Sequence, residues 1–225
     1  MAGARAIPRA ECVWVERVEE DGESRDGLWG DVGALELSEC TGGGVPEQRT
    51  EVRACWTRDA LHLQFAVWDT DPWATLLERK ALLYTEEVVE VFLDPAGDGE
   101  GYFELELNPL NTVLDLALRR NRSGFLKDFG WVCEGLSTGV RRTQWGWVGS
   151  WKIPFLAVAA EPPAAGAVWR VNFCRIDRPK GRPRELSAWV PTLSGTFHSP
   201  RHFGALEFSG PRSAAASLMA RPVVS

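Results

Sequence analysis

Residues 84–108 contain the feature that most constrains the fold, a pair of strand-like segments joined by a turn. The two segments, residues 88–93 and 102–107, flank a stretch rich in Asp, Pro and Gly. Successive side chains point to opposite faces of a strand, and residues of these turn types favour a tight reversal of the chain. The sequence therefore predicts a β-hairpin here.

The alternation within this hairpin gathers polar groups on one face. In the first strand, Glu90 shares a face with two apolar residues. In the second strand, one face carries Tyr102, Glu104, Glu106 and Asn108. We interpret these faces as the polar outer surface of a half-buried hairpin and as one wall of a ligand cleft. For Glu90 the alternative is an ordinary carboxylate, exposed on the strand or paired with an arginine.

The rest of the chain repeats this pattern of short strands and turns. Residues 60–68 alternate between apolar and polar side chains, and about a dozen such segments are separated by Gly- and Pro-containing turns. One short helix is expected at residues 74–83. The pattern predicts an all-β fold, an antiparallel β-sandwich or jelly roll with one short helix in a loop. We expect an N-terminal extension at residues 1–11, a single domain at 12–208 and a frayed C-terminal tail at 209–225.

Charge and cysteine usage exclude several classes of partner and cofactor. The formal net charge of −6 argues against nucleic acid or an anionic membrane as a partner. No stretch approaches the roughly 20 apolar residues of a membrane-spanning helix. The five cysteines are odd in number and show no CxxC spacing, so we expect no zinc site and at least one free thiol. The first residues lack the apolar segment of an export signal, which leaves the compartment open.

The aromatic composition is biased toward tryptophan, with eleven tryptophans and two tyrosines. Large flat rings fill hydrophobic cores and also stack on sugar rings, and both roles stay open. Carboxylate pairs such as Glu86 and Glu87 are too common in strands to indicate a hydrolase. No nucleophile elbow accompanies the three histidines, so no catalytic residue is expected.

Spaced motifs along the chain resemble the family 9 carbohydrate-binding module and its wider relatives. They occur at residues 50–56, 61–71, 87–94, 102–109, 151–155, 169–175 and 189–204, and together cover about residues 12–208. The resemblance implies a β-sandwich that binds sugar without catalysis, usually secreted and accessory to a glycoside hydrolase. It implies an oligo- or polysaccharide of the β-glucan or xylan class as the partner.

The resemblance also implies a set of binding residues. In this family two aromatic rings enclose a sugar while polar groups hold its hydroxyls; the matching positions are Tyr84, Glu90, Asn108, Arg175 and Trp189. Trp73 is a candidate additional ring. The sequence departs from the family pattern at four positions, where Trp, Arg, an amide and Glu are replaced by Tyr84, Glu106, Leu186 and Ser150.

Family members often hold structural calcium, for which carboxylates are suitable ligands. The candidate calcium ligands are four loop aspartates: Asp69, Asp71, Asp94 and Asp98. Ordinary turn capping is the alternative for all four. Two other functions stay open beside sugar binding, a protein-interaction module that has lost its ligand and a haem-binding relative. The second is disfavoured because both methionines are terminal.

Overall fold

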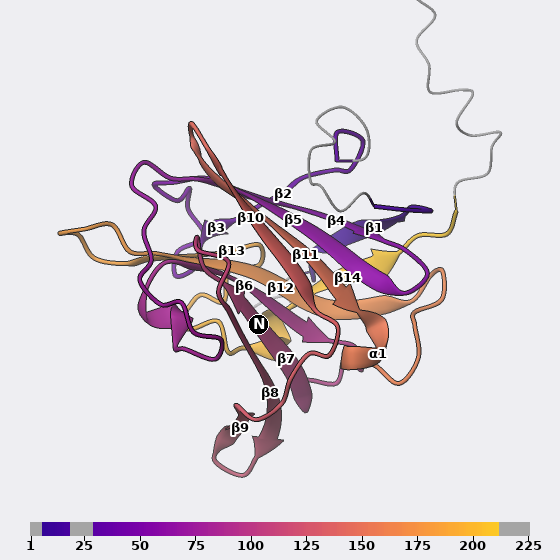
Figure 1. Ribbon diagram of the computed structural model, residues 1–225. Coiled ribbons are helices and arrows are strands. Elements are labelled where there is room, and N and C mark those ends of the chain that lie inside the picture. The colour runs from indigo at the N-terminus through magenta and orange to yellow at the C-terminus, as the bar shows by residue number, and fades with distance from the viewer. Residues whose placement is uncertain (1–5, 19–28, 212–225) are drawn as a thin grey trace, which may run out of the picture.

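The computed structural model describes residues 6–18 and 29–211, which form two β-layers (Figure 1). In chain order the strands are β1 (Arg9–Trp14), β2 (Leu35–Glu36), β3 (Ser38–Glu39), β4 (Thr50–Trp56), β5 (Ala60–Trp68), β6 (Val88–Asp94), β7 (Gly101–Leu107), β8 (Val113–Asn121), β9 (Gly124–Asp128), β10 (Ser137–Thr143), β11 (Gly146–Pro154), β12 (Val168–Asp177), β13 (Glu185–Ala188) and β14 (Gly204–Phe208). The predicted hairpin at residues 84–108 is confirmed as β6 and β7.

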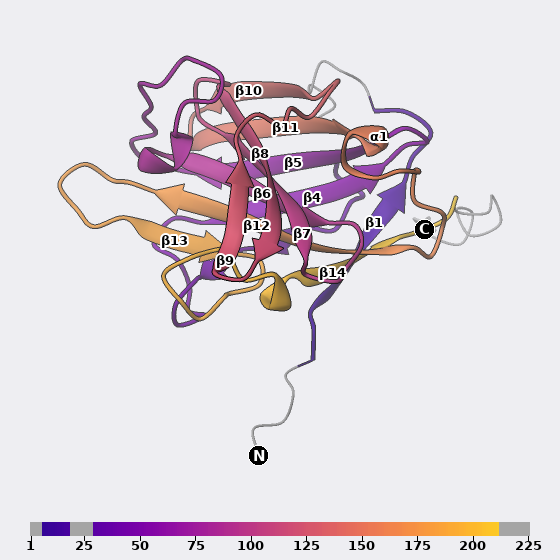
Figure 2. The same cartoon turned by 90° about the horizontal axis from the view of Figure 1, so that it is seen from below.

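The strands divide into two sheets that share β1. Sheet A has the order β14-β12-β6-β7-β8-β9, with β13 beside β12 and β3 beside β13, and sheet B has the order β10-β11-β5-β4, with β2 beside β4. The first residues of β1 pair in parallel with β14, and its last two pair in parallel with β4. In Figure 2, β8 and β9 run steeply across the direction of β5 and β11. The predicted antiparallel sandwich is confirmed, with β1 adding parallel pairings that the sequence did not indicate.

The main core lies between the two sheets because alternate residues of each strand are apolar. Sheet A contributes Val89, Val91 and Leu93 from β6, and sheet B contributes Leu63, Phe65 and Val67 from β5. All six side chains are fully buried. The period of two along residues 60–68 therefore predicted the correct inward face of β5.

A second hydrophobic cluster lies on the opposite face of sheet A and corrects one expectation. Phe92 and Tyr102 pack there against Phe197 and Phe203, which belong to the chain between β13 and β14. The polar face of β7 is therefore covered, and Glu104 and Glu106 are only 2% and 0% exposed. The expectation of a polar outer surface was wrong because local alternation does not indicate which distant segment packs over a sheet.

The helix expected at residues 74–83 is also absent, and this segment is an irregular loop that ends in a single 3₁₀ turn, η1 (Leu83–Thr85). The Glu86 carboxylate accepts the backbone N–H groups of Thr75 and Leu76, which fixes the loop in a non-helical form. The other helical turns are α1 (Phe155–Val158) and η2 (Pro200–His202). Among the described residues no helix has the length and apolarity needed to cross a membrane.

The domain boundaries differ slightly from the expected ranges. β1 begins at Arg9, inside the expected extension, and the backbone N–H of Ser209 donates to the carbonyl of Cys12 at 3.0 Å. The remainder of the expected extension and tail, residues 1–5 and 212–225, lies outside the described residues. All five cysteines are buried free thiols.

Candidate functional site

A cavity of about 230 Å³ opens on the outer face of sheet A, beside the hairpin of β6 and β7. Its walls come from segments far apart in sequence, which include η1, β6, β7, β9 and the chain around β13. The cavity is lined mainly by aromatic and ionisable side chains: Tyr84, Glu90, Glu104, Lys127, Arg184, Phe197 and His198. Two of the predicted site residues, Tyr84 and Glu90, therefore lie at the same cavity.

Three carboxyl groups meet beside this cavity, and two of them, Glu90 and Glu104, line it. Glu90 lies directly across the β6–β7 ladder from Glu106, and Glu104 lies two residues before Glu106 on the same face. Each offers an oxygen within 4.8 Å of the others. Within the described part of the chain, both Glu106 oxygens and Oε2 of Glu104 have no hydrogen-bond partner. These groups keep hydrogen-bonding capacity that a polar ligand can use.

Burial controls the protonation of the three carboxyls. It raises the pKa of Glu90 and of Glu106 well above the ordinary value, and neighbouring carboxylates raise both pKa values further. Burial also raises the pKa of Glu104, but only to about 6. The rise is smaller because the positive charge of Lys127 favours the ionised carboxylate. A buried carboxyl in its neutral form donates one hydrogen bond and accepts others, as a sugar hydroxyl also does.

Lys127 connects the carboxyls to the aromatic side of the cavity. Its Nζ lies 3.7 Å from Oε2 of Glu104, 2.8 Å from Nε2 of His198 and 5.7 Å from the centroid of the Tyr84 ring. Burial, and next the charge of Lys127, lower the pKa of His198 to about 4, so this imidazole is neutral at pH 7. Lys127 then donates to Nε2, and Nδ1–H donates to the Tyr102 hydroxyl 3.0 Å away.

Asn108 lies outside this cavity and organises the loop after β7. Its Oδ1 accepts the backbone N–H groups of Leu110 and Thr112, and its Nδ2 donates to the carbonyl of Leu76 at 2.8 Å. The side chain is fully buried. Its observed contacts are those of a turn-capping residue.

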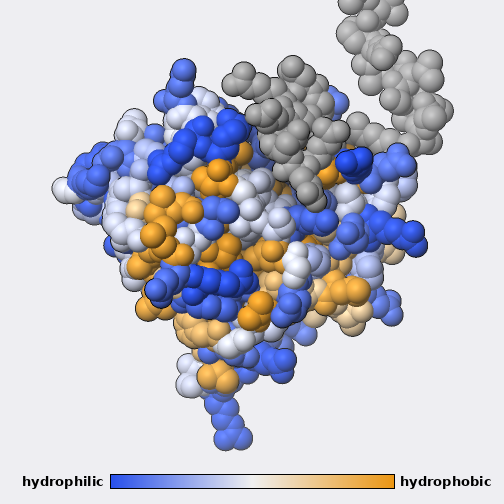
Figure 3. Space-filling model, viewed as in Figure 1, coloured by the Kyte–Doolittle hydropathy of each residue, from blue (hydrophilic) through white to orange (hydrophobic). Residues whose placement is uncertain are grey.

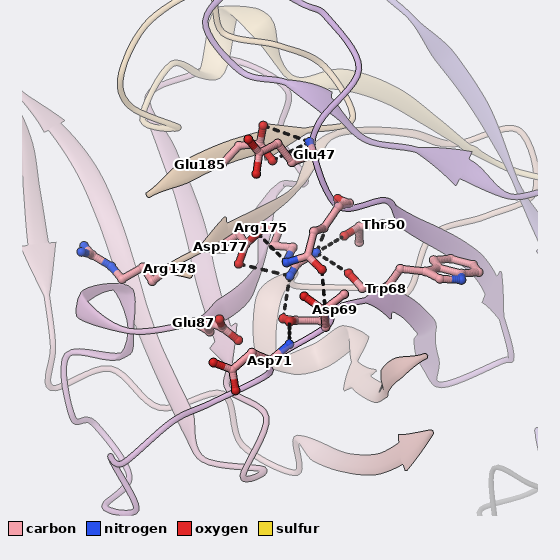
Figure 4. A network of polar contacts seen from close by, with 12 residues as sticks. Glu47, Thr50, Trp68, Asp69, Asp71, Glu87, Arg175, Asp177, Arg178 and Glu185 are labelled. Carbon is pink, nitrogen blue, oxygen red and sulfur yellow. Dashed lines mark hydrogen bonds and ion pairs between the residues drawn. The ribbon is translucent and has the colours of Figure 1, made fainter. Parts of the chain in front are cut away.

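Arg175 lies on the opposite face of sheet A from Glu90. It pairs across the ladder with Val89, whose side chain points into the main core, and it is 2% exposed. Its guanidinium contacts Oδ2 of Asp69 at 2.7 Å and the carbonyl of Trp68 at 3.0 Å. Figure 4 shows this inter-sheet network, in which Arg175 points toward Asp69 and Asp177. The structure does not bring Arg175 to the cavity.

Trp189 packs against the main core and does not line the cavity either. Its ring lies 5.8 Å from that of Phe173, with an interplanar angle of 33°. A Cβ atom at position 204 would lie 2.3 Å from the Trp189 ring, so Gly204 provides the space that the indole occupies. Trp73 is anchored near the inter-sheet network, because its Nε1 donates to the carbonyl of Arg178 at 2.7 Å.

The four candidate calcium ligands do not come together. Asp94 caps the turn after β6 by accepting the backbone N–H groups of Gly97 and Gly99, and Asp98 accepts that of Glu100. Asp71 forms a 3.3 Å ion pair with Lys180 at the surface.

Asp69 instead belongs to a second group of three buried carboxyls, with Glu87 and Asp177. This group surrounds Arg175, whose positive charge already occupies the position between the carboxyls. Burial, and next the charge of Asp69, raise the pKa of Glu87 to about 8. The arginine and a proton on Glu87 together lower the negative charge of this buried group.

Sequence reasoning did not assign Lys127, Arg184, Phe197 or His198 to the site. Glu104 and Glu106 had a usable signal, because their shared face with Tyr102 was visible in the alternation of β7. The other four lie on β9 or around β13, and only tertiary packing brings them to β6. Phe197 and His198 lie within the motif at residues 189–204, but that motif did not assign them to the site.

Comparison with known proteins assigns this architecture to one family. The family model described as "Carbohydrate family 9 binding domain-like" matches residues 20–210. A search of curated proteins finds no match.

Three solved structures share the fold at 17% sequence identity. A family 9 carbohydrate-binding module from Caldicellulosiruptor kristjanssonii in complex with cellotriose has a TM-score of 0.68, covering 96% of this chain and 100% of that one. The module from that organism in complex with glucose has a TM-score of 0.67, with coverages of 91% and 97%. A structure from Bacteroides uniformis has a TM-score of 0.73, with coverages of 91% and 100%.

Proposed function

We propose that this chain, which belongs to the carbohydrate family 9 binding domain-like family, binds carbohydrate without catalysing a reaction on it. The ligand is a β-glucan- or xylan-type sugar held in the cavity beside Tyr84 and Glu90. The observation that carries this proposal is the meeting, in one cavity, of the Tyr84 ring with the buried carboxyls of Glu90 and Glu104, of which Oε2 of Glu104 has no hydrogen-bond partner among the described residues.

The chemistry of a pyranose matches these groups. Its C–H face packs on an aromatic plane, which Tyr84 offers at the cavity wall. Its hydroxyls need partners when they leave water, and neutral Glu90 together with Glu104 can both accept and donate hydrogen bonds. Lys127 and Arg184 add charged donors, whose hydrogen bonds are the stronger kind.

The spacing of the carboxyls favours binding over hydrolysis. Glycoside hydrolases place two carboxyl groups about 5–9.5 Å apart on either side of the bond that breaks. Here the three carboxyls lie within 4.8 Å of one another on neighbouring strands of one wall. A sugar in the cavity would have Glu90 and Glu104 on the same side, and the other described residues of the lining include no carboxyl for the far side of a glycosidic bond.

The first prediction tests the aromatic wall. Replacing Tyr84 with alanine removes the stacking surface, so affinity for cellotriose or xylotriose should fall by about 1–2 kcal/mol, or roughly 5–30-fold. Isothermal titration calorimetry measures the change, and the two sugars compare the glucan and xylan classes. Phe129→Ala is the matched control, because Phe129 is 40% exposed and does not line the cavity.

A second substitution tests the polar wall without removing an aromatic ring. Glu90→Leu keeps an apolar body on β6 but removes both hydrogen-bonding oxygens, so affinity should fall by roughly tenfold or more. Full affinity in both variants would place the sugar elsewhere. If the folded wild-type protein binds neither sugar, the proposal fails and the interaction-module alternative is selected.

A further inference from the structure

A second, larger groove lies on the outer face of sheet B and is not part of the proposed sugar cavity. It has a volume of about 890 Å³ and is formed by residues of β4, β5, β10 and β11 together with the chain at Trp29. Along β5 the outward residues Gln64, Ala66 and Trp68 line it, while the residues between them face the main core. We call this surface the sheet-B groove.

The sheet-B groove has an aromatic platform at one end. The rings of Trp68 and Trp145 stack with centroids 4.7 Å apart at an interplanar angle of 23°. The guanidinium of Arg49 lies 5.0 Å from the centroid of the Trp68 ring. Trp145, in the two-residue turn between β10 and β11, is 39% exposed. A tryptophan at a turn contributes little to the hydrophobic core, and its exposed ring surface is available for stacking.

The charge of the sheet-B groove contrasts with that of the whole chain. Four arginines line it against a single carboxylate, that of Glu51, while the chain as a whole has a net charge of −6. Glu51 forms ion pairs with Arg49 and Arg53. Arg141 and Arg142 are exposed on β10, beside the platform. The groove therefore combines local positive charge with a flat ring, in a molecule that is otherwise acidic.

Figure 3 shows that apolar side chains on the visible face form small groups separated by hydrophilic ones. Such dispersed groups are normal on a monomer and do not indicate a protein interface. The sheet-B groove is likewise too polar for an apolar partner. Its features match a ligand that has a stacking face and a negative charge.

We propose that the sheet-B groove binds a short uronate-bearing segment of an acidic polysaccharide. A uronate residue offers a C–H face for Trp145 and a carboxylate that an arginine can hold with two parallel hydrogen bonds. Arginine is better suited than lysine to such recognition because its fork matches a carboxylate. A nucleic acid is the less favoured occupant, since its affinity comes from many phosphate contacts and the acidic chain offers only this local patch.

The test compares trigalacturonate with cellotriose by isothermal titration calorimetry on the whole chain. The wild type should bind trigalacturonate, and affinity should fall as ionic strength rises. Trp145→Ala should weaken this binding about tenfold or more, and Arg141→Gln several-fold. The matched control is Arg122→Gln, which removes the same charge from the exposed turn between β8 and β9. Tyr84→Ala should leave trigalacturonate binding unchanged, so the two sites are tested separately.

Three outcomes would overturn the proposal. The first is the absence of trigalacturonate binding by the folded wild type. The second is an equal loss of trigalacturonate affinity in Arg122→Gln and Arg141→Gln, which would show that only the net charge of the protein matters. The third is tighter binding of a single-stranded oligonucleotide of equal charge, which would assign the groove to nucleic acid. Arg141→Gln changes only an exposed side chain and should fold normally. It therefore still tests the groove if Trp145→Ala unfolds.

Discussion

At the scale of single residues, two groups of buried carboxyls depend on protonation as well as on pairing. Asp69, Glu87 and Asp177 share one arginine, so a proton on one carboxyl reduces the excess negative charge of the group. The pKa of about 8 at Glu87 reflects burial first and the charge of Asp69 second. A protonated Glu87 can donate to the Asp69 carboxylate, which turns repulsion into a hydrogen bond.

This gives a prediction for the pH dependence of stability. Because the pKa of Glu87 is raised in the folded state, the folded protein binds more protons than the unfolded chain between about pH 4.5 and pH 8. The contribution of Glu87 to the free energy of unfolding is therefore present at low pH and is lost as pH rises through this window. Glu87→Gln keeps an oxygen that accepts the backbone N–H of Trp73, and it should remove this pH dependence of the unfolding free energy.

Chemical denaturation of both proteins at several pH values measures the effect. The unfolding free energy of the wild type minus that of Glu87→Gln should decrease by a few kcal/mol from pH 5 to pH 8. Taking the difference removes the contribution of His62, whose lowered pKa of about 4 acts in the opposite direction. A difference that stays constant with pH would contradict the assignment.

At the scale of elements, the loop before β6 is fixed by ion pairs and not by helix formation. The buried Asp115 carboxylate of β8 contacts Arg79 at 2.7 Å, Lys80 at 2.8 Å and the backbone N–H of Cys133 at 2.7 Å. Lys80 adopts a left-handed backbone conformation with φ of 70°, which a helix does not allow. The sequence of this loop has helical propensity, but contacts with β8 outweigh it.

Asp115→Ala should therefore lower the free energy of unfolding by about 2–4 kcal/mol. This loss of stability is near the lower end of the range expected for breaking a buried ion pair, because Arg79 and Lys80 are partly exposed and remain hydrated. Glu134→Ala, which removes an exposed carboxylate nearby, should change stability by less than about 0.5 kcal/mol. Equal denaturation midpoints for the two variants would show that Asp115 does not anchor the loop.

At the scale of the whole molecule, β1 is the strand that joins the two sheets. Residues 9–12 extend sheet A beside β14, and Val13 and Trp14 extend sheet B beside β4. The Trp56 indole also donates to the carbonyl of Ser209, so both ends of the described chain meet at this edge. The sandwich is closed there by residues that the sequence placed partly outside the domain.

Removing residues 1–11 should consequently destabilise the whole domain. The deletion eliminates most of the pairing with β14, and the melting temperature should fall by roughly 5 °C or more. The control is Ile7→Ala in the full chain, because Ile7 is 47% exposed and precedes β1. Differential scanning calorimetry compares the variants. An unchanged melting temperature after the deletion would show that residues 1–11 are not part of the folded domain.

The sequence by itself determined the class of fold, the central hairpin and the inward faces of its strands, because the period of two in apolar side chains is a local property. It also indicated the family, whose model matches residues 20–210. Alternation within the hairpin singled out Glu90, and the resemblance to the family singled out Tyr84, which lies just before the hairpin.

Tertiary structure alone decided what covers each face. Arg175 and Glu90 belong to paired strands, but ladder register sends one into the core and the other to the cavity. Lys127 reaches Glu104 and Tyr84 from β9, which pairs with β8 in sheet A, and His198 reaches Lys127 from the chain after β13. Such contacts depend on long-range packing that no local pattern encodes. The hairpin at residues 84–108 was therefore predictable as an element, and its site only as two of the residues that surround it.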